Sequence, residues 1–185
     1  LGSVGRMQSG CQLKIGNESG ESLPVGKTGD IYFLPDGGQG STYHYIGAEP
    51  DAIEGGWETL GDMGYLDEEG YLYLCDRKKD MILSGGANIY PAEVEGAIES
   101  HPNVRSCIVV GLPDEDLGQK IHALVDAPEG LTQDSLCAYL ADQLVRYKIP
   151  RSFEFVDDPL RDDAGKARRS VLAEQSSQNL KAKAV

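Results

Sequence analysis

The stretch that decides the fold is Asp76-Arg77-Lys78-Lys79-Asp80-Met81-Ile82-Leu83-Ser84-Gly85-Gly86-Ala87-Asn88-Ile89-Tyr90-Pro91-Ala92-Glu93-Val94-Glu95. It starts with five charged residues, continues with a short apolar run and a glycine pair, and ends where a proline opens a helical pattern. The sequence pattern differs on the two sides of Lys79. We therefore predict a domain boundary there, with domains at residues 1–78 and 79–174 and a tail at 175–185.

Upstream of this stretch, short apolar runs alternate with glycine-rich turns, which is typical of antiparallel strands. Strands are predicted at residues 12–15, 30–34 and 71–74. We expect residues 1–78 to form a glycine-rich antiparallel β subdomain, either a small barrel or a sandwich.

Downstream, the pattern predicts a small α/β domain in which helices cover a short sheet. Strands are expected at 81–83, 104–110, 121–125 and 152–156, and helices at 91–100 and 131–145, the second with Thr132 as its N-cap. Residues 175–185 are polar and contain lysine, and we expect them to be a flexible tail. The chain as a whole is thus expected to be α+β or α/β.

Composition excludes one large class of partner. The chain has 17 basic and 30 acidic residues and a formal net charge of −13, whereas nucleic-acid binding needs a basic face. A local pocket of lysine or arginine for a small phosphate ligand remains compatible with this charge. The four cysteines are widely separated and form no metal or redox motif.

The cellular location and completeness of the chain are also matters of expectation. The cysteine pattern fits a reducing cytoplasm, and there is no signal peptide and no apolar run long enough to cross a bilayer. The first residue is Leu1, not Met, and it stands within a strand pattern. We expect the chain to be a piece of a longer protein.

Two candidate ligand residues lie upstream of the boundary, and each has a structural alternative. Asp62, directly after Gly61, could accept hydrogen bonds from the vicinal diol of a ribose, or it could cap a turn. Arg77 could hold a phosphate or a ribose oxygen, or it could form a surface ion pair. On these patterns alone the structural interpretation is the stronger one.

Two more candidates lie downstream. Gly85 and Gly86, within the segment 84–88, could let a thin ligand approach the backbone closely, or they could form a simple loop. Lys166, after Gly165, could bring an ammonium group to a developing negative charge, or it could belong to a solvated charge run. The three histidines show no metal-ligand spacing, and no metal site is predicted.

The order of these motifs resembles the adenylate-forming superfamily, which includes acyl-CoA synthetases and the adenylation domains of peptide synthetases. The resemblance covers nearly the whole chain, and the segment 84–91 looks closest to the acyl-CoA synthetases. It rests on these motifs: Gly2-Ser3-Val4-Gly5-Arg6, Leu23-Pro24-Val25-Gly26, Trp57 through Asp62, Asp76 through Glu95, Gly111-Leu112-Pro113-Asp114, Tyr147-Lys148-Ile149-Pro150 and Gly165-Lys166. Leu60 stands where the family usually has threonine, with Thr59 one place earlier.

The resemblance implies a role for each candidate. It implies that Asp62 and Arg77 bind the nucleotide and that Lys79 is the hinge of a mobile C-terminal domain. Lys166 would be the catalytic lysine of adenylation. The residues implied for the coenzyme A channel are Ser84, Gly85, Gly86 and Tyr147.

The implied activity is that of an AMP-forming acyl-CoA synthetase, an acid–thiol ligase that converts a carboxylate, ATP and CoA into acyl-CoA, AMP and pyrophosphate. ATP, magnesium and coenzyme A are the implied cofactor and co-substrates, and the family's phosphate-binding loop and magnesium-linked glutamate lie upstream of this sequence. We therefore expect the 185 residues alone to be inactive. The alternatives are an adenylation domain that loads a carrier protein, and a non-catalytic module that binds a nucleotide or pantetheine.

Overall fold

The computed structural model describes residues 2–41, 51–127 and 130–183. The chain divides into two compact units, Leu1–Lys79 and Asp80–Val185. This division falls one residue after the predicted boundary at 78/79. The two units are connected by η1, a short 3₁₀ helix at Lys78–Asp80.

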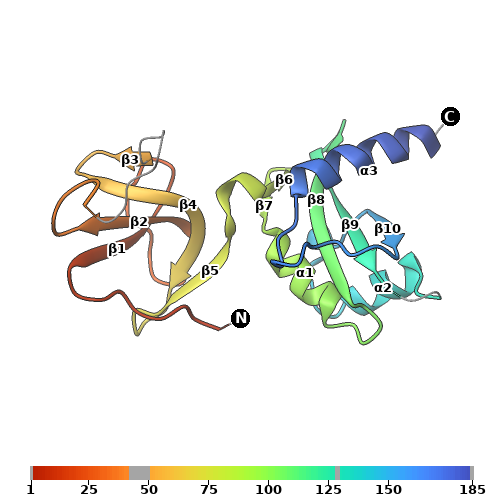
Figure 1. Ribbon diagram of the computed structural model, residues 1–185, viewed down its shortest axis with the longest axis horizontal. Coiled ribbons are helices and arrows are strands. Elements are labelled where there is room, and N and C mark those ends of the chain that lie inside the picture. The colour runs from red at the N-terminus through yellow and green to blue at the C-terminus, as the bar shows by residue number, and fades with distance from the viewer. Residues whose placement is uncertain (1, 42–50, 128–129, 184–185) are drawn as a thin grey trace. The chain divides into compact units, whose positions relative to one another are not determined.

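The first unit is built on one antiparallel sheet, to which the described residues contribute five strands (Figure 1). The strands are paired in the order β1-β2-β4-β3, and β5 pairs with the remaining part of β4. Their bounds are β1 Cys11–Gly16, β2 Gly29–Pro35, β3 Asp51–Ile53, β4 Trp57–Leu66 and β5 Leu72–Arg77. A small core of Ile15, Ile31 and Leu72 lies on this sheet.

The longest strand of this sheet, β4, was not predicted, because glycines interrupt its apolar pattern. Gly64 nonetheless fits the strand, because a Cβ atom at this position would lie 2.3 Å from the carbonyl oxygen of Tyr73 on β5. The pairing of β4 with β5 shifts register between Met63 and Gly64. The glycine therefore permits a close approach of two backbones at a β-bulge.

The second unit has a mixed sheet in which β9 pairs in parallel with β10 and antiparallel with β6 and β8. Its strands are β6 Ile82–Ser84, β7 Ala87–Ile89, β8 Ser106–Asp114, β9 Gly118–Asp126 and β10 Ser152–Val156. Its helices are α1 Pro91–Glu99, α2 Gln133–Leu140, α3 Arg169–Lys183 and the 3₁₀ helix η2 Arg146–Lys148.

Helices cover both faces of this sheet (Figure 1). Apolar residues of α1 and α2, among them Val94 and Leu136, share one buried core with alternate residues of β8 and β9. The other residues of the same two strands pack against Leu172 and Leu180 of α3. Side chains alternate between the faces of a strand, so a nearly continuous apolar run in β8 serves both cores. These two units confirm the predicted fold class.

The start of α2 confirms its predicted N-cap. The hydroxyl of Thr132 accepts a hydrogen bond from the backbone N–H of Ser135, and the Ser135 hydroxyl accepts one from the N–H of Thr132. This reciprocal pair is a capping box. The helix ends at Leu140 and not at Val145 as predicted, and turns lead on to η2.

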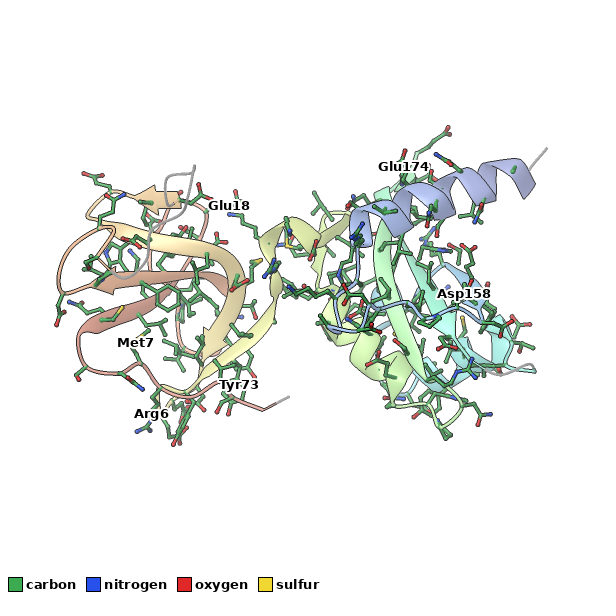
Figure 2. The ribbon with its side chains drawn as sticks, in the orientation of Figure 1. Arg6, Met7, Glu18, Tyr73, Asp158 and Glu174 are labelled. Carbon is green, nitrogen blue, oxygen red and sulfur yellow. The ribbon has the colours of Figure 1, made fainter. Side chains whose placement is uncertain are left out.

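The predicted tail at residues 175–185 is wrong for the described part of that segment, which is helical to Lys183. Leu172, Ser176 and Leu180 recur every four residues and face the sheet, whereas Glu174 points away from it (Figure 2). The carboxylate of Glu154 on β10 accepts hydrogen bonds from Ser176 and Asn179. The face of this helix that packs on the sheet has the polar residue Ser176 between Leu172 and Leu180. Its composition therefore did not distinguish the helix from a polar tail.

No helix in the described ranges is both long and apolar enough to cross a membrane.

Candidate functional site

Asp62 and Arg77 lie opposite each other on β4 and β5. Asp62 lies within the strand β4 and not in a turn. The Asp62 Oδ1 atom is 3.7 Å from the Arg77 Nε atom, and the two side chains are 33% and 64% exposed. An ion pair this exposed contributes little to stability. Because both side chains are partly exposed, they are accessible to a polar ligand.

The backbone beside Asp62 is shaped by Gly61, which has a positive φ of +74°. Its N–H donates to the hydroxyl of Thr59 over 3.1 Å. Thr59 thus makes a local hydroxyl contact next to the aspartate, although Leu60 occupies the place at which the family usually has threonine.

Lys79 lies between two residues that form ion pairs within their own units. The Nζ atom of Lys78 is 2.8 Å from Oδ2 of Asp30, which is nearly fully buried. On the other side, Oδ2 of Asp80 is 3.7 Å from Nε of Arg169.

The glycine pair forms the turn of a hairpin and not an open loop. Ser84 on β6 pairs with Ala87 on β7, and the two residues between them, Gly85 and Gly86, have φ values of +57° and +80°. Two consecutive positive φ values are typical of the two-residue hairpin turn that fits the twist of a sheet. The Gly85 N–H donates to the carbonyl oxygen of Leu117 over 3.0 Å, which fixes the turn against the β8–β9 hairpin.

A cavity of about 860 Å³ lies beside this turn, entirely within the second unit. Three of the residues implied for the coenzyme A channel line it together, namely Ser84, Gly85 and Tyr147. Gly86 is not among its lining residues. Tyr147 is on η2 and is 59% exposed.

Two arginines that the sequence analysis did not identify also line this cavity, Arg146 and Arg151. Among the described residues neither guanidinium has a carboxylate within ion-pair distance, whereas the adjacent Lys148 is paired with Glu93. Two unpaired guanidinium groups beside an exposed aromatic ring favour a ligand with phosphates and a flat ring. In the sequence, the signal that could have identified these two arginines was their position on either side of Tyr147.

Lys166 is held by a compact loop that closes on itself. The Asp162 Oδ1 atom accepts the backbone N–H groups of Ala164 and Lys166 over 3.0 and 2.8 Å. The Asp162 N–H donates to the carbonyl of Lys166, and Gly165 has a φ of +72°. The lysine side chain is exposed and makes no ion pair with the described residues. The loop thus presents an ammonium group to solvent from a hydrogen-bonded backbone turn.

Comparison with known proteins shows what this fold is similar to. Residues 93–166 match the sequence model of the family described as AMP-binding enzyme C-terminal domain. The relatives of the chain are ligases of the adenylate-forming superfamily, which confirms the resemblance seen in the sequence.

Among the relatives, the chain is 37% identical over 172 residues to 2-succinylbenzoate–CoA ligase of Bacillus mycoides, covering 93% of this chain and 36% of that protein. It is 35% identical over 175 residues to the fatty acid–[acyl-carrier-protein] ligase ScoC of Streptomyces coeruleorubidus, covering 94% and 34%. The chain therefore spans about a third of the length of the curated relatives it matches.

Solved structures show the same likeness. The o-succinylbenzoate-CoA synthetase of Bacillus subtilis, in complex with the acyl-adenylate OSB-AMP, matches with a TM-score of 0.81 and 36% identity over 92% of this chain and 35% of that one. ATP-bound MatB of Rhodopseudomonas palustris matches with a TM-score of 0.80 and 31% identity, covering 95% and 36%.

Proposed function

We propose that the chain is the C-terminal portion of an AMP-forming acid–thiol ligase that uses coenzyme A, and that its second unit is a lobe that turns about Lys79. The observation that carries the proposal is the cavity of about 860 Å³ that Ser84, Gly85 and Tyr147 line together. Its two unpaired guanidinium groups suit the nucleotide phosphates of CoA.

In the first half-reaction, a carboxylate oxygen of the substrate attacks the α-phosphorus of ATP and pyrophosphate leaves. Negative charge builds on the phosphoryl oxygens, and the ammonium group of Lys166 stabilises it. Asp62 and Arg77 hold the nucleotide, the former through the ribose hydroxyls. The product is the acyl-adenylate.

In the second half-reaction, the thiolate of CoA attacks the acyl carbon and AMP leaves with the electron pair of the broken acyl–oxygen bond. The lobe first turns about Lys79, which removes Lys166 and brings the Ser84–Gly86 turn to the adenylate. Closure of the lobe in each state excludes water from the reactive anhydride.

Magnesium and the remainder of the ATP site are assigned to no residues of this chain. In the described ranges no cluster of three or more His, Cys, Asp or Glu residues could hold a metal ion. We expect the 185 residues alone to form no acyl-CoA.

The test of the catalytic assignment separates the half-reactions in the complete ligase that carries this chain. Lys166→Ala should abolish carboxylate-dependent exchange of pyrophosphate into ATP while largely sparing thioester formation from supplied acyl-adenylate. Arg168→Ala, which removes an exposed positive charge two residues away, is the matched control and should affect neither. Equal loss of both half-reactions in Lys166→Ala would contradict the role of the lysine.

A carrier protein is the second candidate for the thiol acceptor, because one relative is named as an acyl-carrier-protein ligase. Both acceptors present a pantetheine arm, but only CoA adds an adenosine 3′,5′-diphosphate. Titration of this chain with CoA and with pantetheine distinguishes them. We expect CoA to bind at least about tenfold more tightly and Arg151→Ala to remove that difference. Equal binding of the two ligands would favour the carrier protein.

A further inference from the structure

A buried carboxylate in the second unit has no part in the function proposed so far. Glu95 lies on α1, is 5% exposed, and accepts the backbone N–H of Val109 over 2.8 Å. Its Oε2 atom is 3.0 Å from Nη2 of Arg169 and 3.5 Å from Nη2 of Arg161. A second nitrogen of Arg169, Nη1, donates to Oε1.

Packing alone does not account for a glutamate at this position. Its neighbours on the same helix face, Val94 and Ile98, are fully buried in an apolar core. Burial of a charge is costly unless the charge is paired and hydrogen-bonded. The arrangement around Glu95 is therefore specific, because two arginines from a distant part of the chain satisfy one carboxylate.

These two arginines lie on either side of the loop that holds Lys166. Arg161 precedes Asp162, at which the loop begins, and Arg169 starts α3 directly after the loop. Nη1 of Arg161 is also 3.4 Å from the carbonyl oxygen of Gly165, the residue before the lysine. Both ends of the loop are thus tied to the same buried carboxylate.

The network also reaches the start of the unit. Nε of Arg169 is 3.7 Å from Oδ2 of Asp80, the residue that follows the proposed hinge. The Nη1 atom of the same arginine donates to the carbonyl of Val109 on β8. A single guanidinium therefore connects the first residue after Lys79, the central sheet and Glu95.

We propose that Glu95, Arg161 and Arg169 are positioning residues for Lys166, and that through Asp80 they make the lysine loop and the hinge-proximal end of the unit move as one piece. This rests on the proposed function of Lys166. A lysine side chain is long and flexible, so the place that its ammonium group reaches is set by how firmly the loop backbone is held. Displacement by about 1 Å can cost a reaction about a hundredfold in rate.

The first experiment measures loop order in the chain itself by ¹⁵N relaxation. For Gly165 and Lys166 we expect amide order parameters near ~0.8 in the wild type and below ~0.6 in Arg161→Gln. The matched control Arg105→Gln breaks an arginine–aspartate pair elsewhere in the unit and should leave the loop unchanged. A loop that is equally ordered in Arg161→Gln, or already mobile in the wild type, would overturn the proposal.

The second experiment measures half-reactions in the complete ligase. Arg161→Gln should lower kcat for pyrophosphate exchange at least about tenfold, with KM for ATP and thioester formation from supplied adenylate within about twofold of wild type. Arg161→Lys, which keeps a positive charge and one donor, should recover part of kcat. A purely structural role would lower both half-reactions together, without recovery by lysine.

The two possible failures are distinguishable. If Lys166→Ala leaves exchange intact, the proposed function is wrong, whereas the relaxation data still report whether Arg161 orders the loop. If Arg161→Gln loosens the loop but exchange is unchanged, the positioning role is wrong and the function of Lys166 stands. Should Arg161→Gln not fold, Asp80→Asn probes the same network from its other end and is expected to give the same selective loss.

Discussion

The residues on the two sides of Lys79 are anchored in different ways. Lys78 makes one ion pair with Asp30, a buried carboxylate of the first sheet. Asp80 contacts Arg169, which branches to Glu95, a buried carboxylate of the second unit. The first anchor ends at a strand, whereas the second continues to the loop of Lys166.

This difference suggests that the two anchors have different roles. On the first side β5 is paired with β4 up to Arg77, and Lys78 adds an ion pair with Asp30. The branched network has to hold the chain from Asp80 and also fix a loop whose placement determines where the lysine reaches. The two anchors leave Lys79, in a short 3₁₀ helix, as the residue between two attached neighbours.

The largest effect is expected when the carboxylate at the centre of the branched network is removed. Glu95→Gln leaves two guanidinium groups without their counter-charge and should destabilise the second unit by about 3 kcal/mol, the low end for broken buried pairs. Urea unfolding followed through the amide protons of β8 and β9 measures this. Asp126→Asn, which breaks a pair with the half-exposed Arg105, should cost less than about 1 kcal/mol; equal losses would contradict a special role for the network.

The corresponding change in the first unit should have a smaller effect. Asp30→Asn removes the charge that faces Lys78, but the lysine side chain is 43% exposed and can be solvated. We expect a loss of about 1 kcal/mol after allowance for this exposure. Trp57, the one tryptophan of the chain, lies on β4 and reports unfolding of this unit by fluorescence. A loss as large as that of Glu95→Gln would show that the anchors are equivalent.

Raising the pH should weaken only the lysine anchor. The hydrogen bond to Asp30 raises the pKa of Lys78 above 10.5, against a lowering from burial. A pKa raised by folding contributes stability that is fully present below the unfolded value of about 10.4 and is lost as the pH rises through the folded value. The stability difference between wild type and Asp30→Asn should therefore be constant from about pH 7 to 10 and shrink above that range.

The arginine network provides the control for this pH series. A guanidinium keeps its charge throughout this range, so the difference between wild type and Glu95→Gln should not shrink with it. Urea unfolding of both variant pairs at about pH 7, 9 and 11 makes the comparison. Equal shrinkage in the two units would refute the distinction between the anchors.

The sequence predicted those parts of the fold that local patterns determine. Alternating apolar residues located β1, β2 and β10, and Thr132 located the start of α2. Local pattern failed for β4, where Gly61 and Gly64 break the alternation. Gly61 has a positive φ, and Gly64 allows the close approach of β5.

The candidate site shows the same limit. Motif order identified Asp62, Ser84, Gly85, Tyr147 and Lys166 as candidates, and three of them share one cavity. The partners of Glu95 could not be inferred in this way, because Arg161 and Arg169 are 66 and 74 residues away along the chain. The local indication of a partner was the position of Glu95 between the core residues Val94 and Ile98 of α1, because a buried carboxylate needs a counter-charge.

The most direct test of the account is to restrict the backbone at the proposed hinge and measure both half-reactions. Proline fixes φ near −65°, so Lys79→Pro in the complete ligase should favour one orientation of the lobe, whereas Lys79→Ala should leave the backbone free. The account predicts that in Lys79→Pro one half-reaction, either pyrophosphate exchange or thioester formation from supplied acyl-adenylate, falls by more than about tenfold while the other stays within about threefold of wild type. Unchanged rates for both half-reactions, or an equal fall in both, would contradict a lobe that carries Lys166 and the Ser84–Gly86 turn to the same adenylate in alternation.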